Sequence, residues 1–462
     1  MKRLLTLTAS WALLTLAVCG DPAGGGAARA EAAVDTVAGV ERLSYSAEPT
    51  GELGWVMDTA AVIGDAFAED AYQFDQVLAE RVAGDAAGNL YVLDASGHRI
   101  LKYGPDGEHL ATYGRQGEGP GELSQPLGMT IGPGDTIWVT DFSNTRLTGF
   151  PQDGGQPRLV PLPEGAGVPG LRLAIRDDGI LMLFRPLFNF RRGPGGGMRM
   201  SRGDGDDEGP RRLPLLRVDP SLQPLDTLWR TLEPPMDMVQ LESGQQVMIT
   251  MMAREFWPEF QWQSFSDGGI VLSDTAAYVL HLLDPDGTPR RVIRREPAPR
   301  AAMESDRERV RQRLREESEE GVGIRIGGSG PDNATRRRML EQRLEKMTFA
   351  DVIPQVVRLR VDPSDRIWVG VAEEAPDSVS RIDLYDREGW LLGELRSVPM
   401  PDVFLGPNRI GVLGRDELDV QQIVLLDLHA EADAARADDQ SSTPTALMFT
   451  NSSIPSRLSS RP

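Results

Sequence analysis

The sequence predicts an all-β chain folded as a six-bladed β-propeller, with a helical hairpin inserted between blades four and five. Three observations support this fold. A β-rich segment recurs at a fixed interval, so that Val139 follows Val92 by 47 residues. Each copy contains several short strands separated by Gly-containing turns such as Pro105-Asp106-Gly107. The chain has 462 residues, a natural size for one propeller. A period of this length with several strands per copy is typical of propellers.

The second strand of each copy begins at an apolar residue, and six copies can be counted in this way. Successive starts are 47, 43, 90, 97 and 43 residues apart, and the two long intervals contain insertions. The starts are Leu90, Ile137, Ile180, Ile270, Ile367 and Ile410. The sixth copy lacks a fourth strand, while a β-rich run near 55–63 has no copy of its own. We expect this N-terminal strand to complete blade six, which removes free sheet edges.

The expected propeller spans residues 50–430, and its insertions are of two kinds. Residues 191–212 and 234–258 are read as excursions within the third and fourth copies. Residues 300–348 are read as a helical hairpin, because apolar residues such as Leu340 and Leu344 recur at helical spacing. Its narrow apolar stripes suit a helix lying on a propeller face. The hairpin is interpreted either as a solvated cover for one blade edge or as a lid or docking site. The tail 431–462 lacks periodicity and is expected to be disordered.

The N-terminus reads as a targeting segment over residues 1–30. Lys2 and Arg3 precede an apolar run over residues 4–18, which is typical of a secretory signal. Cleavage after an Ala-x-Ala site at 28–30 and lipidation of Cys19 both fit, and the choice stays open. Either route predicts an exported protein in the periplasm, the cell envelope or the extracellular space. Membrane contact is expected only through a lipid on Cys19, which is also the sole cysteine.

The formal net charge of −20 argues against a nucleic-acid partner, because a phosphate backbone would be repelled. We expect a monomer whose partner is an envelope protein, peptide or glycan.

Residues 113–123 (YGRQGEGPGEL) and the following Pro126-Leu127-Gly128 resemble the inter-blade linker of NHL-repeat six-bladed β-propellers. The resemblance is specific over residues 79–155 and weaker over 171–428. The whole layout is similar to exported bacterial propellers of no assigned activity. Propellers of related fold include RNA-binding domains, metal-dependent lactonases and an amidating lyase. The resemblance therefore implies a fold and no single function.

Metal-dependent relatives are implied to hold zinc or calcium in the central channel through His, Asp, Glu or Asn. None of the four histidines of this chain is expected in an innermost strand; they are His98, His109, His281 and His429. The acidic stretch 204–208 lacks the ligand spacing of a calcium-binding EF-hand loop. We therefore assign no catalytic residue, no metal ligand and no cofactor, and neither calcium nor zinc is supported.

One set of residues points to a ligand. Eight or nine residues before the second-strand starts, three of the six copies carry an arginine, namely Arg81, Arg172 and Arg358. Because innermost strands line the channel, these arginines are predicted to form a positive collar that binds a carboxylate or a phosphate. The alternative is that they form structural ion pairs with Glu80 or with acidic groups of neighbouring blades.

These observations predict an exported, non-catalytic propeller that binds a protein, peptide or glycan at the cell envelope. The alternative is a metal-dependent hydrolase similar to the lactonases and lyases, with its site in the central channel.

Overall fold

The computed structural model describes residues 30–430, except residues 48–50, 66, 75–76, 164–167, 177–178, 186–187, 193–197, 203–209, 244–245, 320–332, 374–377, 417 and 419. The signal segment with Cys19, the acidic stretch 204–208 and the tail 431–462 lie outside the described residues. None of the described helices combines the length and the apolar character that crossing a membrane requires.

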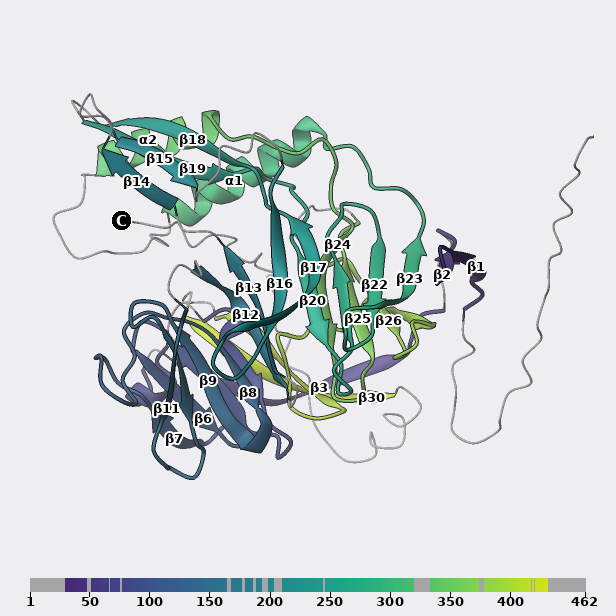
Figure 1. The fold of residues 1–462 in the computed structure, drawn as a ribbon, viewed down its shortest axis with the longest axis horizontal. Coiled ribbons are helices and arrows are strands. Elements are labelled where there is room, and N and C mark those ends of the chain that lie inside the picture. Colours follow the sequence, from purple (N-terminus) through teal and green to yellow (C-terminus); the bar gives the residue numbers. More distant parts are fainter. Residues whose placement is uncertain are drawn as a thin grey trace, which may run out of the picture.

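The described residues form six blades, each a sheet with four antiparallel strands, so the predicted six-bladed propeller is confirmed (Figure 1). From the inner to the outer strand, the first three blades are β4 (Val82–Gly84), β5 (Leu90–Asp94), β6 (Arg99–Tyr103) and β7 (His109–Tyr113); β8 (Pro126–Gly132), β9 (Thr136–Asp141), β10 (Arg146–Phe150) and β11 (Arg158–Pro161); and β12 (Val168–Arg176), β13 (Gly179–Arg185), β16 (Arg212–Val218) and β17 (Pro224–Leu232). The last three are β20 (Gln261–Ser264), β21 (Ile270–Ser273), β22 (Val279–Leu283) and β23 (Pro289–Arg295); β24 (Val356–Val361), β25 (Ile367–Val371), β26 (Arg381–Tyr385) and β27 (Leu391–Leu395); and β28 (Val403–Phe404), β29 (Arg409–Arg415), β30 (Gln421–Ala430) and β3 (Trp55–Ile63).

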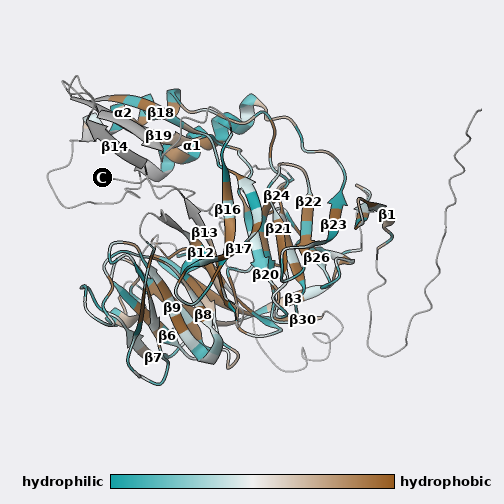
Figure 2. Ribbon diagram, viewed as in Figure 1, coloured by the Kyte–Doolittle hydropathy of each residue, from teal (hydrophilic) through white to brown (hydrophobic). Residues whose placement is uncertain are grey.

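The inner strands of neighbouring blades lie against one another around the central channel. Strand β4 contacts both β28 and β8, β8 contacts β12, and β20 contacts β24. The second strands are buried along their whole length in blades one, four and five, because each blade packs against a neighbour on both faces. Figure 2 shows the corresponding bands of hydrophobic residues along the blade strands. This burial on both faces explains why the second strands read as continuous apolar runs.

The hydrophobic core is divided into clusters that lie between adjacent blades. One cluster joins each neighbouring pair, from blades one and two round to blades six and one. Between blades five and six, for example, the Trp368 ring lies 5.7 Å from the Trp55 ring and 5.5 Å from the Phe404 ring. The repeated apolar positions of the sequence therefore act as inter-blade contacts, which stabilise the ring without disulfides.

Blade six is completed by the N-terminal strand β3, which pairs antiparallel with β30. The pairing runs from Trp55 opposite Ala430 to Ile63 opposite Ile423, with one irregularity near Thr59. Ile63 is fully buried in the cluster between blades six and one. The two ends of the described propeller thus meet in one sheet.

A second N-terminal segment extends blade four, ahead of the expected propeller boundary at residue 50. Strand β2 (Val40–Tyr45) pairs parallel with β23, and β1 (Ala33–Val37) pairs with β2. The hydroxyl of Tyr45 donates to the Gly389 carbonyl at 3.2 Å and accepts from the Leu391 N–H at 3.0 Å. The segment therefore covers the outer edge of blade four and ties it to blade five.

Three insertions leave the propeller at one face. They are the hairpin β14 (Phe188–Arg192) and β15 (Met198–Arg202), the hairpin β18 (Met236–Ser243) and β19 (Gln246–Ala253), and the helices α1 (Glu304–Glu319) and α2 (Asn333–Glu345). Each one follows the second or the fourth strand of a blade, and those connections lie at the same end of an up-and-down blade. Figure 1 shows the insertions gathered on one side of the propeller.

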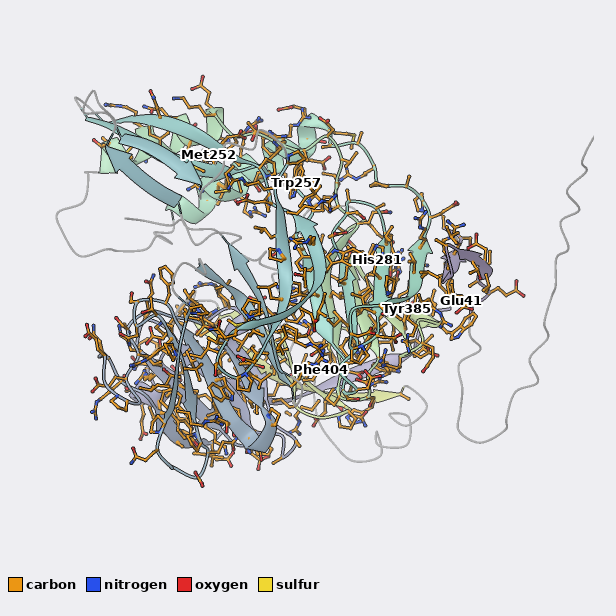
Figure 3. All side chains as sticks on the ribbon, viewed as in Figure 1. Glu41, Met252, Trp257, His281, Tyr385 and Phe404 are labelled. Atoms are coloured by element: carbon orange, nitrogen blue, oxygen red, sulfur yellow. The ribbon has the colours of Figure 1, made fainter. Side chains whose placement is uncertain are left out.

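The helices pack on the second hairpin rather than on the propeller face where the sequence placed them. Val310 of α1 and Leu344 of α2 share a small buried cluster with residues of β18 and β19, among them Met252. Figure 3 shows Met252 in this inserted module, well away from Phe404 at the propeller centre. The apolar stripes of both helices are thus used within the inserted module.

Short 3-10 turns mark some of the connections. They are η1 (Asp70–Tyr72), η2 (Ala79–Arg81) and η3 (Pro133–Asp135). The second of these carries Glu80 and Arg81 to the start of inner strand β4.

Candidate functional site

The central channel contains a cavity of about 440 Å³. Its lining includes at least one residue from every blade: Val82, Met129, Arg172, Gln263, Arg360 and Asp402. The lining continues along the inner strands to the turns that follow them, with Ser266 and Asp365 at that end. A cavity of this size at the axis, built by all blades together, is the best candidate for a binding site among the described residues.

Two of the three predicted collar arginines meet around this channel. Arg172 donates from Nη2 to Glu80 Oε1 at 3.0 Å and from Nη1 to the Trp262 carbonyl at 2.8 Å. Arg358 donates from Nη1 to Asp402 Oδ1 at 2.6 Å. Each therefore forms an ion pair that crosses from one blade to another.

The third predicted arginine, Arg81, is placed elsewhere. Its Nε donates to the Leu127 carbonyl of blade two at 3.0 Å, and the side chain is buried without lining the cavity. Because η2 turns the chain just before β4, it is the neighbouring Glu80 that lines the channel. Arg81 thus links blade one to blade two.

Arg360 is the site residue that the sequence reasoning missed. It is 6% exposed and lines the cavity, and it makes one hydrogen bond, from Nη1 to the Leu359 carbonyl at 3.1 Å. Burial and the charges of Arg172 and Arg358 lower the pKa of Arg360 well below its ordinary value. A signal was present in the sequence, since residues two apart on a strand share a face and Arg358 and Arg360 flank Leu359.

The acidic partners of the arginines are themselves shielded from water. Burial alone would raise the pKa of Glu80, but the charges of Arg172, Arg360 and Arg358 lower it overall. Asp402 is 8% exposed, and its Oδ2 accepts the Leu413 N–H at 2.7 Å. Both carboxylates are therefore held ionised by contacts already formed within the propeller.

The far end of the cavity carries two further aspartates that have partners of their own. Asp362 Oδ2 accepts from Arg366 Nε at 2.6 Å and from the Trp368 indole N–H at 3.0 Å. Asp365 accepts from the Ser266 N–H at 2.8 Å and lies 3.9 Å from Arg387. The lining is thus acidic at the turns and rich in arginine toward the insertion side.

No group of three or more His, Cys, Asp or Glu residues in the described part of the chain is arranged to hold a metal ion. The histidines lie outside the inner strands: His98 in a turn with φ of 52°, His109 in β7, His281 in β22 and His429 near the end of β30. Their places leave the channel chemistry to arginine, carboxylate, hydroxyl and amide groups.

Comparison with known proteins supports the repeat assignment. The chain is 30% identical over 109 residues to human NHL repeat-containing protein 3, covering 23% of this chain and 30% of that protein. It is 32% identical over 75 residues to the mouse protein, covering 16% and 22% respectively. The chain thus spans less than a third of these relatives, and no protein-family model matches it. The resemblance to NHL repeats is confirmed.

Solved structures with a similar fold are distant in sequence. A protein of Bacteroides fragilis with an inferred export is 10% identical, with a TM-score of 0.42, covering 84% of this chain and 99% of that one. A gluconolactonase of Xanthomonas campestris is 15% identical, with a TM-score of 0.36, covering 77% and 87%. No conclusion about activity follows from these likenesses.

Proposed function

We propose that this chain is an exported, non-catalytic propeller that binds a protein, peptide or glycan of the cell envelope, with the central channel as its binding site. The observation that carries the proposal is the cavity of about 440 Å³, to which all six blades contribute. Its volume lies within the roughly 300–1,000 Å³ typical of small-molecule sites. It suits one terminal unit of a peptide or glycan, and the rest of the partner would lie outside the channel.

The arrangement of charges favours binding over metal-dependent hydrolysis. A lactonase-like or lyase-like site needs oxygen or nitrogen ligands that converge at the axis. In this propeller Arg172 and Arg358 occupy the positions at which such ligands would meet, and each holds a carboxylate in an ion pair. A cation placed there would be repelled by the guanidinium groups, including that of Arg360.

A photo-cross-linking experiment tests the binding role. A benzophenone amino acid replaces Thr130, which lines the cavity, and in a second variant it replaces Leu225, which is 52% exposed on outer strand β17. Illumination in the producing cells is expected to yield a discrete adduct from the channel position and none from the outer position. The absence of any adduct specific to position 130 would contradict the channel as the binding site.

Metal content separates the proposal from its alternative. The purified protein is expected to contain no stoichiometric zinc or calcium, and a chelator is expected to leave its Tm unchanged. One bound metal per chain, with a Tm that falls on chelation, would instead support the hydrolase.

A further inference from the structure

Arg360 presents a buried positive charge that the propeller itself leaves without an anion. Its guanidinium has five N–H donors, of which one donates to the Leu359 carbonyl. Among the described residues it forms no ion pair, although it is 6% exposed and lines the cavity. A buried charge without a partner is unfavourable by several kcal/mol, so its retention calls for a compensating group.

The neighbouring charges cannot supply that compensation. Glu80 is paired with Arg172, and Asp402 is paired with Arg358. Three guanidinium groups therefore face two carboxylates, which leaves an excess of one positive charge at this end of the cavity.

The acidic residues at the other end are also committed, because Asp362 is paired with Arg366 and Asp365 accepts two hydrogen bonds from Ser266. The excess charge remains at Arg360.

We infer that Arg360 anchors a single carboxylate of a small polar ligand inside the channel, with Arg172 and Arg358 holding the surrounding carboxylates away from it. The inference rests on the proposed function, since it names the ligand class of the same site. A carboxylate brings the one negative charge that the cluster lacks and can accept two parallel N–H donors from one guanidinium.

The rest of the cavity indicates a polar ligand body. Thr130, Gln263 and Ser264 line the channel beside the arginines and present hydroxyl and amide groups. The amide of Gln263 is oriented by the Leu359 carbonyl, to which its Nε2 donates at 3.2 Å. Such groups suit the hydroxyls of a sugar acid or the amides of a peptide end, two sources of the same carboxylate.

Titration calorimetry with matched probes tests the inference. The probes are glucuronate against glucose, and trialanine against its C-terminal amide, with inorganic phosphate as a fifth probe. At constant pH and ionic strength, one of the two acids is expected to bind at least about tenfold more tightly than its neutral counterpart, which corresponds to about 1.4 kcal/mol. The acid that binds identifies the source of the carboxylate.

Variants locate the carboxylate at Arg360. Arg360→Met is expected to weaken the acid at least about tenfold, and Arg360→Lys to weaken it less, because the charge is kept and the paired donors are lost. Arg338→Met, on the exposed surface of α2, is the control and is expected to change nothing.

Three results would overturn the inference. They are equal binding of acid and neutral probe, binding that survives Arg360→Met, and tighter binding of phosphate than of either acid. In the first two cases the channel would remain a binding site, so the proposed function would stand.

Discussion

The charge excess at Arg360 makes an unusual prediction for the ligand-free protein: removing this arginine should stabilise the fold. Arg360→Met keeps most of the apolar stem and deletes the buried charge. Loss of an uncompensated buried charge is worth about 3–5 kcal/mol. Loss of the hydrogen bond to the Leu359 carbonyl costs about 1 kcal/mol. The net expectation is a gain of about 2–4 kcal/mol.

Arg172→Met should have the opposite effect, although it also removes a channel arginine. This change leaves Glu80, whose side chain is 14% exposed, without the partner that now lies at 3.0 Å. Breaking a buried pair by removing one member is destabilising by about 3–5 kcal/mol. The exposed control Arg338→Met should stay within about 0.5 kcal/mol of the parent protein.

Thermal unfolding measured by calorimetry checks these signs. With an unfolding entropy of about 2.1 cal/mol/K per residue over roughly 400 folded residues, 1 kcal/mol corresponds to about 1 °C in Tm. We expect Tm to rise by about 2–5 °C for Arg360→Met and to fall by a similar amount for Arg172→Met. A fall in Tm for both variants would refute the reasoning, because Arg360 would then have a compensating partner within the fold.

Three further predictions concern the closure of the ring, the inserted module and the effect of pH. Ile63→Ala in the closing strand should cost about 2–5 kcal/mol in denaturant unfolding, because the side chain is fully buried, whereas Val62→Ala at a 47% exposed position should cost less than about 0.5. Asp306→Ala should speed hydrogen exchange in α1 and leave the blades protected, because the buried Asp306 carboxylate accepts two hydrogen bonds from Arg300, at 2.6 and 2.9 Å; equal loss of protection in the blades would contradict it. Burial lowers the pKa of His281 despite the nearby charge of an aspartate, so stability should fall as the pH drops below 6.5, where the unfolded chain takes up the proton first; His281→Phe should flatten this slope, and an unchanged slope would show that other groups cause it.

The blades could be predicted because their signals are local. Each copy repeats short β-rich runs and Gly-containing turns, and counting the copies was enough to expect a closing strand near 55–63, where the structure has β3 at Trp55–Ile63. Strand β2 gave no such signal, since it pairs parallel with β23 about 250 residues away along the chain, as Glu41 opposite Arg291 shows. Long-range pairing of this kind leaves no periodic trace in either segment.

The inserted module shows the same division. Helical spacing indicated both helices, but spacing cannot say which surface an apolar stripe will meet. The stripe residues Val310 and Leu344 pack on the hairpin β18–β19, which the sequence showed only as an excursion over 234–258.

The candidate site was predicted in part. Alignment of the inner strands located Arg172 and Arg358, because a repeated fold places equivalent positions around one axis. It misplaced Arg81, whose direction is set by a single 3-10 turn, and it passed over Arg360 because only one register position was compared. Which arginine keeps an unbalanced charge depends on contacts between blades, and those contacts exist only in the folded ring.

The location of a bound carboxylate tests the central claim most directly. A crystal structure of the protein with glucuronate or trialanine, whichever binds, would show where the acid lies. We predict that its carboxylate is inside the central channel, at about 2.7–3.0 Å from the guanidinium nitrogens of Arg360. A carboxylate bound outside the channel, or a ligand that turns an uncharged group toward Arg360, would contradict the account.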